Sequence, residues 1–244
     1  MARTAPGRGP NQLPPGRHGL PRSYVAHNQR ARILVAVAET VSEGGGYTRM
    51  SVEDIVRRAG VSRKTFYEQF ANKDEAFLAA FDDGAKLLLA SVRSAVDAEK
   101  TFAGRVIAGF GTFLAVLAAS PAFAHLCIVE VLAAGPEAIE RRTRVMAEFA
   151  AMIQENAALL PRARRVPALT ADAIVGGIYE AIFRRIAAGE AARLPELLPD
   201  VVELALMPYI GEKKAIAISE KLRVDPDPVA VVAAELAITP IARM

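Results

Sequence analysis

The side chains best suited to bind an anion or to read a pattern of hydrogen bonds gather in one short stretch of the sequence. Arg63 and Lys64 are adjacent, and Tyr67 follows within one helical turn. Guanidinium and ammonium groups pair with phosphate oxygens, and both can donate to O6 and N7 of a guanine in the major groove of DNA. Thr65 and Gln69 form a second edge, suited to a thymine methyl group, an adenine or a phosphate. We therefore expect this segment to contact double-stranded DNA.

Two short helices joined by a tight turn are expected to hold these side chains in place. The first helix is marked by apolar residues with the i, i+3, i+4, i+7 spacing of one buried stripe, namely Val52, Ile55, Val56 and Ala59. Gly60 stands where a helix commonly ends in a left-handed residue, and Ser62 is a suitable N-cap for the second helix. Phe66 and Phe70, one turn apart, are expected to be buried. This order is typical of a helix-turn-helix, whose second helix enters the major groove.

The residues at the predicted helix starts support the same interpretation. Ser51 with Asp54 has the spacing of a capping box, and Asn72 with Glu75 repeats it before the next helix. Lys73 then falls in a first helical turn, where the helix dipole disfavours a cation. A nearby DNA phosphate would explain that lysine, and a solvated surface lysine is the alternative.

This stretch resembles the DNA-binding domain of the tetracycline-repressor (TetR) family of transcriptional regulators over roughly residues 28 to 78. The resemblance is carried by Tyr47-Thr48, Ile55, Ala59-Gly60-Val61-Ser62, Thr65-Phe66-Tyr67, Phe70 and Lys73. It implies an all-α protein with an N-terminal three-helix helix-turn-helix domain and a C-terminal helical bundle for effector binding and dimerisation. It also implies that Tyr67 and Lys73 contact phosphates. The candidate DNA-binding residues are Thr48, Ser51, Ser62, Arg63, Lys64, Thr65, Tyr67, Gln69 and Lys73.

The distribution of charge along the 244 residues agrees with a nucleic-acid reader. Through Lys73 the chain has 12 Lys and Arg against 5 Asp and Glu, a net charge of +7, and the remainder has 18 against 22, a net charge of −4. A basic segment attached to a mildly acidic body is the expected electrostatic footprint.

Breaks at proline and glycine divide the chain into four parts. We expect a disordered basic arm (1–22), a helix-turn-helix domain (23–72), a helical ligand-binding and dimerisation domain (73–223) and a C-terminal tail (224–244) without an assigned role. The arm either reaches DNA or is an unimportant tail. Outside the motif, helices are expected at about 23–42, 73–95, 101–119, 121–134, 136–160, 170–188 and 196–210, with a further short helix at 211–223.

Other classes of function find little support in the sequence. Cys127 is the only cysteine, and the three histidines are scattered without metal-ligand spacing. Gly44-Gly45-Gly46 follows a predicted helix and not a strand, and no Ser-His-Asp arrangement is recognisable, so we expect no enzyme, cofactor or metal. The apolar run Val106 to Ala119, which contains Gly109, Gly111 and Thr112, is short for a membrane span and fits a buried helix. We expect a soluble cytoplasmic protein that makes no membrane contact.

The helices between residues 102 and 183 are rich in aromatic side chains, and helical bundles place ligand sites between helices. Candidate ligand-binding residues are Phe110, Phe113, Phe123, His125, Cys127, Glu130, Phe149, Met152 and Tyr179. His125 and Glu130 are five residues apart and so are not expected on one face of an α-helix. These residues favour an unknown apolar or amphipathic effector that releases a repressor from a palindromic operator. The alternative is a regulator with a filled core that responds to a protein partner.

The segment Thr170 to Ala188 carries more apolar surface than one buried stripe needs. One i+4 ridge holds Asp172, Gly176, Glu180 and Arg184, and the rest of the segment is nearly all apolar. In the family that the chain resembles, the last two long helices of the effector domain pair with those of a second copy. We therefore expect a homodimer, with a helix buried inside a monomer as the alternative. The candidate interface residues are Ile174, Gly177, Ile178, Ala181, Ile182, Val201, Leu204 and Ala205.

Overall fold

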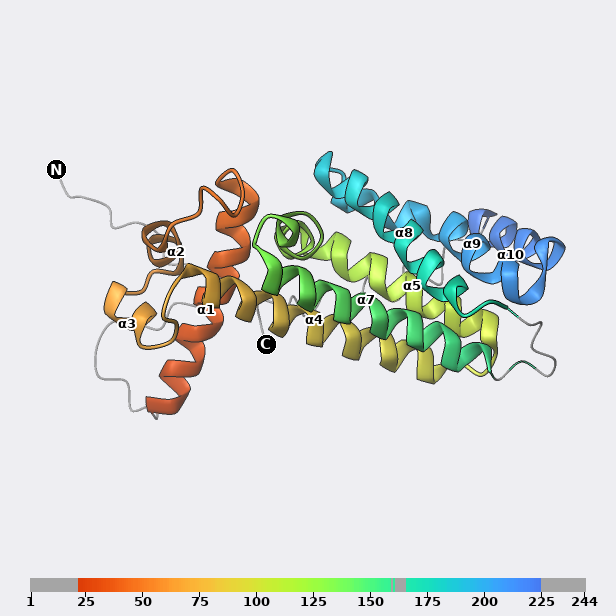
Figure 1. Ribbon diagram of the computed structural model, residues 1–244, viewed down its shortest axis with the longest axis horizontal. Helices are drawn as coiled ribbons and strands as arrows, with labels where there is room; N and C mark the ends of the chain where they lie inside the picture. Colours follow the sequence, from red (N-terminus) through yellow and green to blue (C-terminus); the bar gives the residue numbers. More distant parts are fainter. Residues whose placement is uncertain (1–21, 159, 161–165, 225–244) are drawn as a thin grey trace.

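The computed structural model describes residues 22–158, 160 and 166–224, and within these residues it contains helices and turns but no strand. Figure 1 shows an elongated molecule, in which α1 to α3 form a compact group at one end and the other helices form a long bundle. The expected all-α architecture, a helix-turn-helix domain followed by a helical bundle, is confirmed. The expected arm and tail lie outside the described residues, apart from Arg22 and Val224.

The N-terminal group consists of α1 (Arg22–Glu43), α2 (Val52–Ala59) and α3 (Arg63–Tyr67). Its local signals act as the sequence predicts. The Ser51 hydroxyl accepts from the Asp54 N–H at 3.2 Å, and the Ser62 hydroxyl accepts from the Thr65 N–H at 3.0 Å. Gly60 ends α2 in the left-handed region, with φ 61° and ψ 39°. Phe66 and Phe70 are buried beneath α3 and fix it against the core.

Helix α4 (Lys73–Ala98) runs from this group into the bundle, where it lies beside α5 (Phe102–Ala119) and α7 (Pro136–Ala157) (Figure 1). The Asn72 side chain caps α4 by accepting from the Glu75 N–H at 2.8 Å. Helix α5 is long and apolar enough to cross a membrane by composition, but half of its residues are buried within the bundle. We therefore interpret α5 as a core helix of the bundle. Buried core helices of soluble proteins can be as long and as apolar as a membrane span.

The segment expected to form one helix at 121–134 is irregular, which corrects the prediction. Four residues of α-helix, α6 (Pro121–Ala124), lead into a π-helix, η1 (His125–Val129), and a 3₁₀ turn, η2 (Glu130–Leu132). In η1 the Glu130 N–H donates to the carbonyl of His125, five residues earlier. This wider turn brings residues that are five apart onto the same side, which an α-helix does not do.

The remaining helices pack along the other side of the bundle: α8 (Leu169–Ala187), the 3₁₀ segment η3 (Ala191–Leu197), α9 (Leu198–Ile210) and α10 (Glu212–Val224). The helix predicted at 196–210 thus begins as a 3₁₀ segment that contains Pro195. The Ser219 hydroxyl donates to Glu203 at 2.5 Å, and Arg223 pairs with Asp200 at 2.5 Å. These contacts fasten α10 to α9.

Candidate functional site

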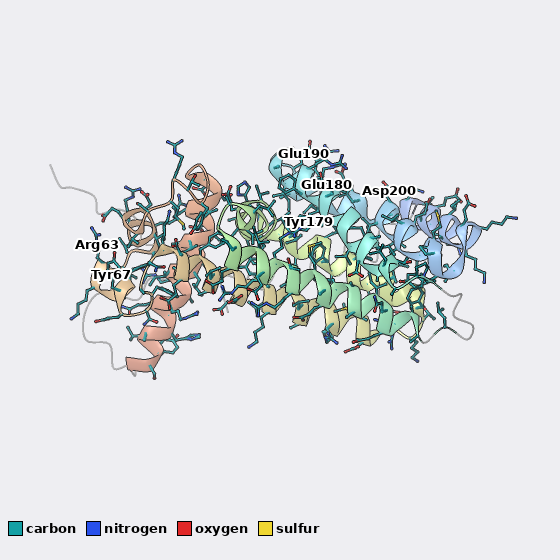
Figure 2. The ribbon with its side chains drawn as sticks, viewed as in Figure 1. Arg63, Tyr67, Tyr179, Glu180, Glu190 and Asp200 are labelled. Carbon is teal, nitrogen blue, oxygen red and sulfur yellow. The ribbon has the colours of Figure 1, made fainter. Side chains whose placement is uncertain are left out.

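The cationic side chains of α3 point away from the rest of the molecule. Figure 2 shows Arg63 and Tyr67 at the end opposite the bundle. The side chains of Arg63 and Lys64 are 65% and 87% exposed. Arg63 lies 3.5 Å from Glu53 and Lys64 lies 3.9 Å from Glu68, and exposed pairs of this kind contribute little free energy. An external anion can therefore replace either carboxylate at small cost.

The other predicted DNA contacts lie at the same end but differ in their availability. Thr48 is exposed, whereas the hydroxyls of Ser51 and Ser62 already cap α2 and α3. The Thr65 hydroxyl lies 2.9 Å from that of Ser62. Gln69 is half-buried and lies beyond the end of α3, which is only five residues long.

Lys73 is not a freely solvated lysine. Its Nζ donates to the carbonyl of Tyr47 at 3.2 Å and to that of Met50 at 3.1 Å, and it lies 4.8 Å from the centroid of the Tyr47 ring. These bonds hold the loop between α1 and α2, which explains a cation in the first turn of α4. An ammonium group has three N–H donors, so one remains for a phosphate.

Tyr47 joins three parts of the molecule, a role that the sequence analysis missed. Its hydroxyl donates to Asp74 at 2.5 Å, and its ring packs edge-on against Phe77 with centroids 5.0 Å apart. Its backbone N–H donates to Glu130 Oε2 at 2.7 Å, across 83 residues of sequence. Burial and the hydrogen bond to Asp74 raise the pKa of Tyr47, so the phenol stays protonated. The loop before α2 is thus bonded directly to the segment that follows the π-helix.

The predicted ligand residues His125 and Glu130 do not line the cavity in the bundle. The π-helix places them on one side, with His125 Nδ1 3.8 Å from Glu130 Oε1. That side meets the loop at Gly46 and Tyr47 and not the interior of the bundle. They therefore belong to the junction between the two domains.

The cavity lies between α4, α5, the α6–η1 segment, α7 and α8, and has a volume of about 110 Å³. The predicted ligand residues that line it are Phe110, Phe113, Phe123, Cys127, Phe149, Met152 and Tyr179. Along α7 the lining runs from Arg142 to Asn156, which spans about 20 Å at the rise of an α-helix. A cavity of roughly 150 Å³ is known to hold benzene, so this one is long but narrow.

We call this long, narrow cavity the slot. The polar groups of its lining lie toward its two ends. At the far end, Arg105 is satisfied: its Nη1 donates to Asn156 Oδ1 at 2.7 Å and its Nε donates to the carbonyl of Glu99 at 2.8 Å. At the end nearer α1, the guanidinium of Arg142 lies 3.9 Å from the centroid of the Tyr179 ring. The Nε of Arg142 is buried and has no hydrogen-bond partner among the described residues.

The sequence contains a pattern that indicates an inward-facing position for Arg142. Val145, Met146 and Phe149 follow it at the i+3, i+4 and i+7 positions of one helical stripe, and all of them line the cavity. A charge on an apolar stripe marks a cation that faces the interior.

Tyr179 and Cys127 have structural tasks beside this cation. The Tyr179 hydroxyl donates to the carbonyl of Ile128 in η1 at 2.5 Å. Burial raises the pKa of Cys127 well above its ordinary value, and burial likewise raises that of Tyr179. A protonated thiol is a poor nucleophile. Among the described residues no group of His, Cys, Asp and Glu is arranged to hold a metal ion.

The predicted dimer residues separate into an inner set, buried within the chain itself, and an outer set that a second copy could reach. Five of them are at most 5% exposed and pack within the chain's own core: Ile174, Ile178, Ile182, Val201 and Ala205. The isoleucines recur every fourth residue and so form the side of α8 that faces the bundle. Gly177 and Leu204 are exposed and Ala181 is half-buried, so a second copy can reach only these three.

Comparison with known proteins assigns residues 34–80 to a family model and finds solved structures with the same fold. Residues 34–80 match the model of the tetR family of bacterial regulatory proteins. A curated relative, the HTH-type transcriptional activator FasR of Mycolicibacterium smegmatis, is 33% identical over 96 residues, which cover 39% of this chain and 43% of the relative. The match thus spans less than half the length of that relative.

Solved structures share the fold at low sequence identity. The fatty acid degradation regulator FadR of Bacillus halodurans superposes with a TM-score of 0.67 at 19% identity and covers 73% of this chain and 94% of its own. FadR of Bacillus subtilis, solved in complex with stearoyl-CoA, gives 0.63 at 18% identity, with 71% and 96% covered. TylP of Streptomyces fradiae gives 0.61 at 18% identity, with 86% and 98% covered.

Proposed function

Because the chain belongs to the tetR family of bacterial regulatory proteins, we propose that it is a dimeric repressor that leaves a palindromic operator when a small amphipathic molecule enters its bundle. The cationic face of α3 supports the contact with DNA. The exposed side of α8 and α9, at Gly177, Ala181 and Leu204, is the proposed dimer surface. The slot between α4 and α8 is the proposed effector site.

One observation carries the link between effector and operator. The segment from Pro121 to Leu132 takes part in both sites: Phe123, Cys127 and Ile128 line the slot, and Glu130 accepts the hydrogen bond from Tyr47. Tyr47 in turn is bonded to α4 through Asp74 and Lys73. A ligand that displaces the lining side chains therefore acts on the same segment that holds the loop before α2.

The size of the slot supports a conformational response. A volume of about 110 Å³ is too small for a long molecule, so its entry requires the lining side chains to move. The ligand then shifts the protein toward a form with a wider slot, by an amount set by its difference in affinity for the two forms. A hundredfold loss of operator affinity corresponds to about 2.7 kcal/mol of coupling, and linkage requires the operator to weaken ligand binding by the same factor.

The apolar lining and the length of the slot favour a long-chain acyl compound. The solved complex of FadR from Bacillus subtilis with stearoyl-CoA gives independent support for this class. A filled core would have favoured the alternative, a regulator that responds to a protein partner. A cavity with an apolar middle and polar side chains at its ends, Arg142 and Tyr179 at one and Asn156 at the other, supports the small-molecule effector instead.

Selection from random DNA tests the proposed contact with the operator. The expected product is a palindrome whose half-site centres lie about one helical turn apart, roughly 34–36 Å. Arg63→Ala is expected to relax the preference at one base position, with a cost of about 1–3 kcal/mol on the preferred site only. Arg193→Ala, which removes another largely exposed arginine, in η3, is the matched control and should leave operator binding unchanged. Recovery of DNA without a palindrome would contradict the proposal.

A promoter–reporter assay tests the direction of regulation. If the protein represses, its deletion raises expression from the selected operator, and a long-chain acyl compound raises it in the intact strain. The relative FasR is named an activator, and a fall in expression after deletion would assign that direction to this protein as well.

A further inference from the structure

Arg142 is a cation in an apolar place without an anion beside it. Its side chain lines the slot together with Val145, Met146 and Phe149, and its Nε is buried. No described carboxylate forms an ion pair with it, whereas its neighbour Arg141 pairs with Asp82 at 3.0 Å and with Glu137 at 2.8 Å. Arg142 as a whole is half-buried, and even partial burial of a charge without a partner costs free energy, so such groups are normally paired.

The contact that Arg142 makes with Tyr179 does not give its Nε–H an acceptor. The guanidinium carbon lies 3.9 Å from the centroid of the Tyr179 ring, and burial raises the pKa of the Tyr179 hydroxyl more than the cation lowers it. The Tyr179 hydroxyl is already engaged with the carbonyl of Ile128. The Nε–H of Arg142 therefore has no acceptor among the described residues, and it belongs to a planar guanidinium, the group that binds a carboxylate through two hydrogen bonds.

At the opposite end of the slot, the cation already has hydrogen-bond acceptors. Arg105 donates to Asn156 and to the Glu99 carbonyl, so its main donors already have acceptors. Between the two ends the lining is apolar over about 20 Å of α7. The slot is therefore asymmetric, with an unsatisfied cation at the end nearer α1.

We propose that Arg142 binds the carboxylate of a free long-chain acid whose chain lies along the slot toward Asn156. This inference rests on the proposed function and narrows its effector class. A thioester of the same acid has a neutral carbonyl at this position and cannot form the charged pair. A carboxylate at Arg142 would also lie beside Tyr179, which is bonded to η1, so the head group would meet the segment that contacts Tyr47.

The test compares three probes with the same chain on the purified full-length protein: palmitate and palmitoyl-CoA below their micellar concentrations, and 1-hexadecanol below its solubility limit. Calorimetry gives their dissociation constants. Palmitate is expected to bind about tenfold or more tightly than either other probe, because hydrogen bonds to a charged group are lost with the carboxylate. Arg142→Met should remove that preference and leave hexadecanol unchanged, while Arg142→Lys should retain part of it. Arg141→Met, whose arginine pairs with surface carboxylates, is the matched control and should keep it.

Three results would overturn the inference. In the first, the wild type binds hexadecanol or palmitoyl-CoA as tightly as palmitate. In the second, Arg142→Met weakens all three probes equally, which would assign a purely structural role to the arginine. In the third, no probe binds. Operator affinity without any probe is measured on every variant, so a misfolded variant is recognised, and loss of DNA binding by the wild type would refute the proposed function separately.

Discussion

At the scale of single residues, Glu130 accepts the hydrogen bond through which we propose that the two domains are coupled. Glu130→Ala removes the acceptor for the half-buried Tyr47 N–H, while Glu130→Gln keeps an oxygen there. An unsatisfied buried donor costs about 1–3 kcal/mol, so we expect the alanine variant to melt earlier and the glutamine variant to melt close to the wild type. The alanine variant should also bind the operator with an affinity that responds less to palmitate. Thermal melts and operator titrations with and without palmitate measure both effects, and an unchanged response in Glu130→Ala would exclude this route.

How far single residues could be predicted depended on how local their interactions are. Ser51, Gly60 and Ser62 act within three or four residues, so their roles follow from spacing alone. Lys73 was recognised as unusual, but its partners Tyr47 and Met50 lie more than twenty residues away, and a phosphate was the nearest available explanation. The bond from Tyr47 to Glu130 has no signature in either local sequence.

At the scale of elements, the close approach of Gly84 in α4 to Phe123 in α6 gives a stability prediction. A Cβ atom on Gly84 would lie 1.9 Å from the ring of Phe123, which is buried and lines the slot. Gly84→Ala must therefore displace that ring, and we expect it to destabilise the fold by about 1–3 kcal/mol, as overpacking does. Gly111→Ala is the matched control in α5, because its Cβ would meet Leu198 at an ordinary 3.8 Å. Chemical denaturation measures both, and equal midpoints for the two variants would contradict this account of the packing.

The elements themselves were predictable wherever periodicity is strong. The ranges of α1, α4, α5, α7 and α8 agree with expectation to within a few residues, because breaks at proline and glycine or capping residues mark most of their ends. The segment 121–134 was not predictable in detail. Its apolar run from Leu126 to Val129 fits an α-turn and a π-turn equally, and the choice is made by packing against α1 and α8.

At the scale of the whole molecule, the exposed side of α8 and α9 determines the expected assembly. Gly177 is exposed and a Cβ there meets nothing within 4 Å, so Gly177→Arg fits the isolated chain without a clash. We expect this variant to remain folded but to be monomeric, and to bind a palindromic operator weakly because two recognition helices are no longer held at one spacing. Ala151→Arg, on the exposed side of α7, is the control and should remain dimeric. Light scattering distinguishes the two, and a dimer of Gly177→Arg would place the interface on another surface.

The π-helix η1 also determines how graded a response through this segment can be. A π-turn and an α-turn differ by one whole residue, and a helix has no stable register between them. Loss of the extra residue would rotate Glu130 by about 100° relative to His125, the angle between successive residues of an α-helix. For a regulator that works through η1, the contact at Tyr47 is therefore either present or absent in each molecule. Intermediate effector concentrations then change the proportion of molecules in each form, and not the strength of the contact within one molecule.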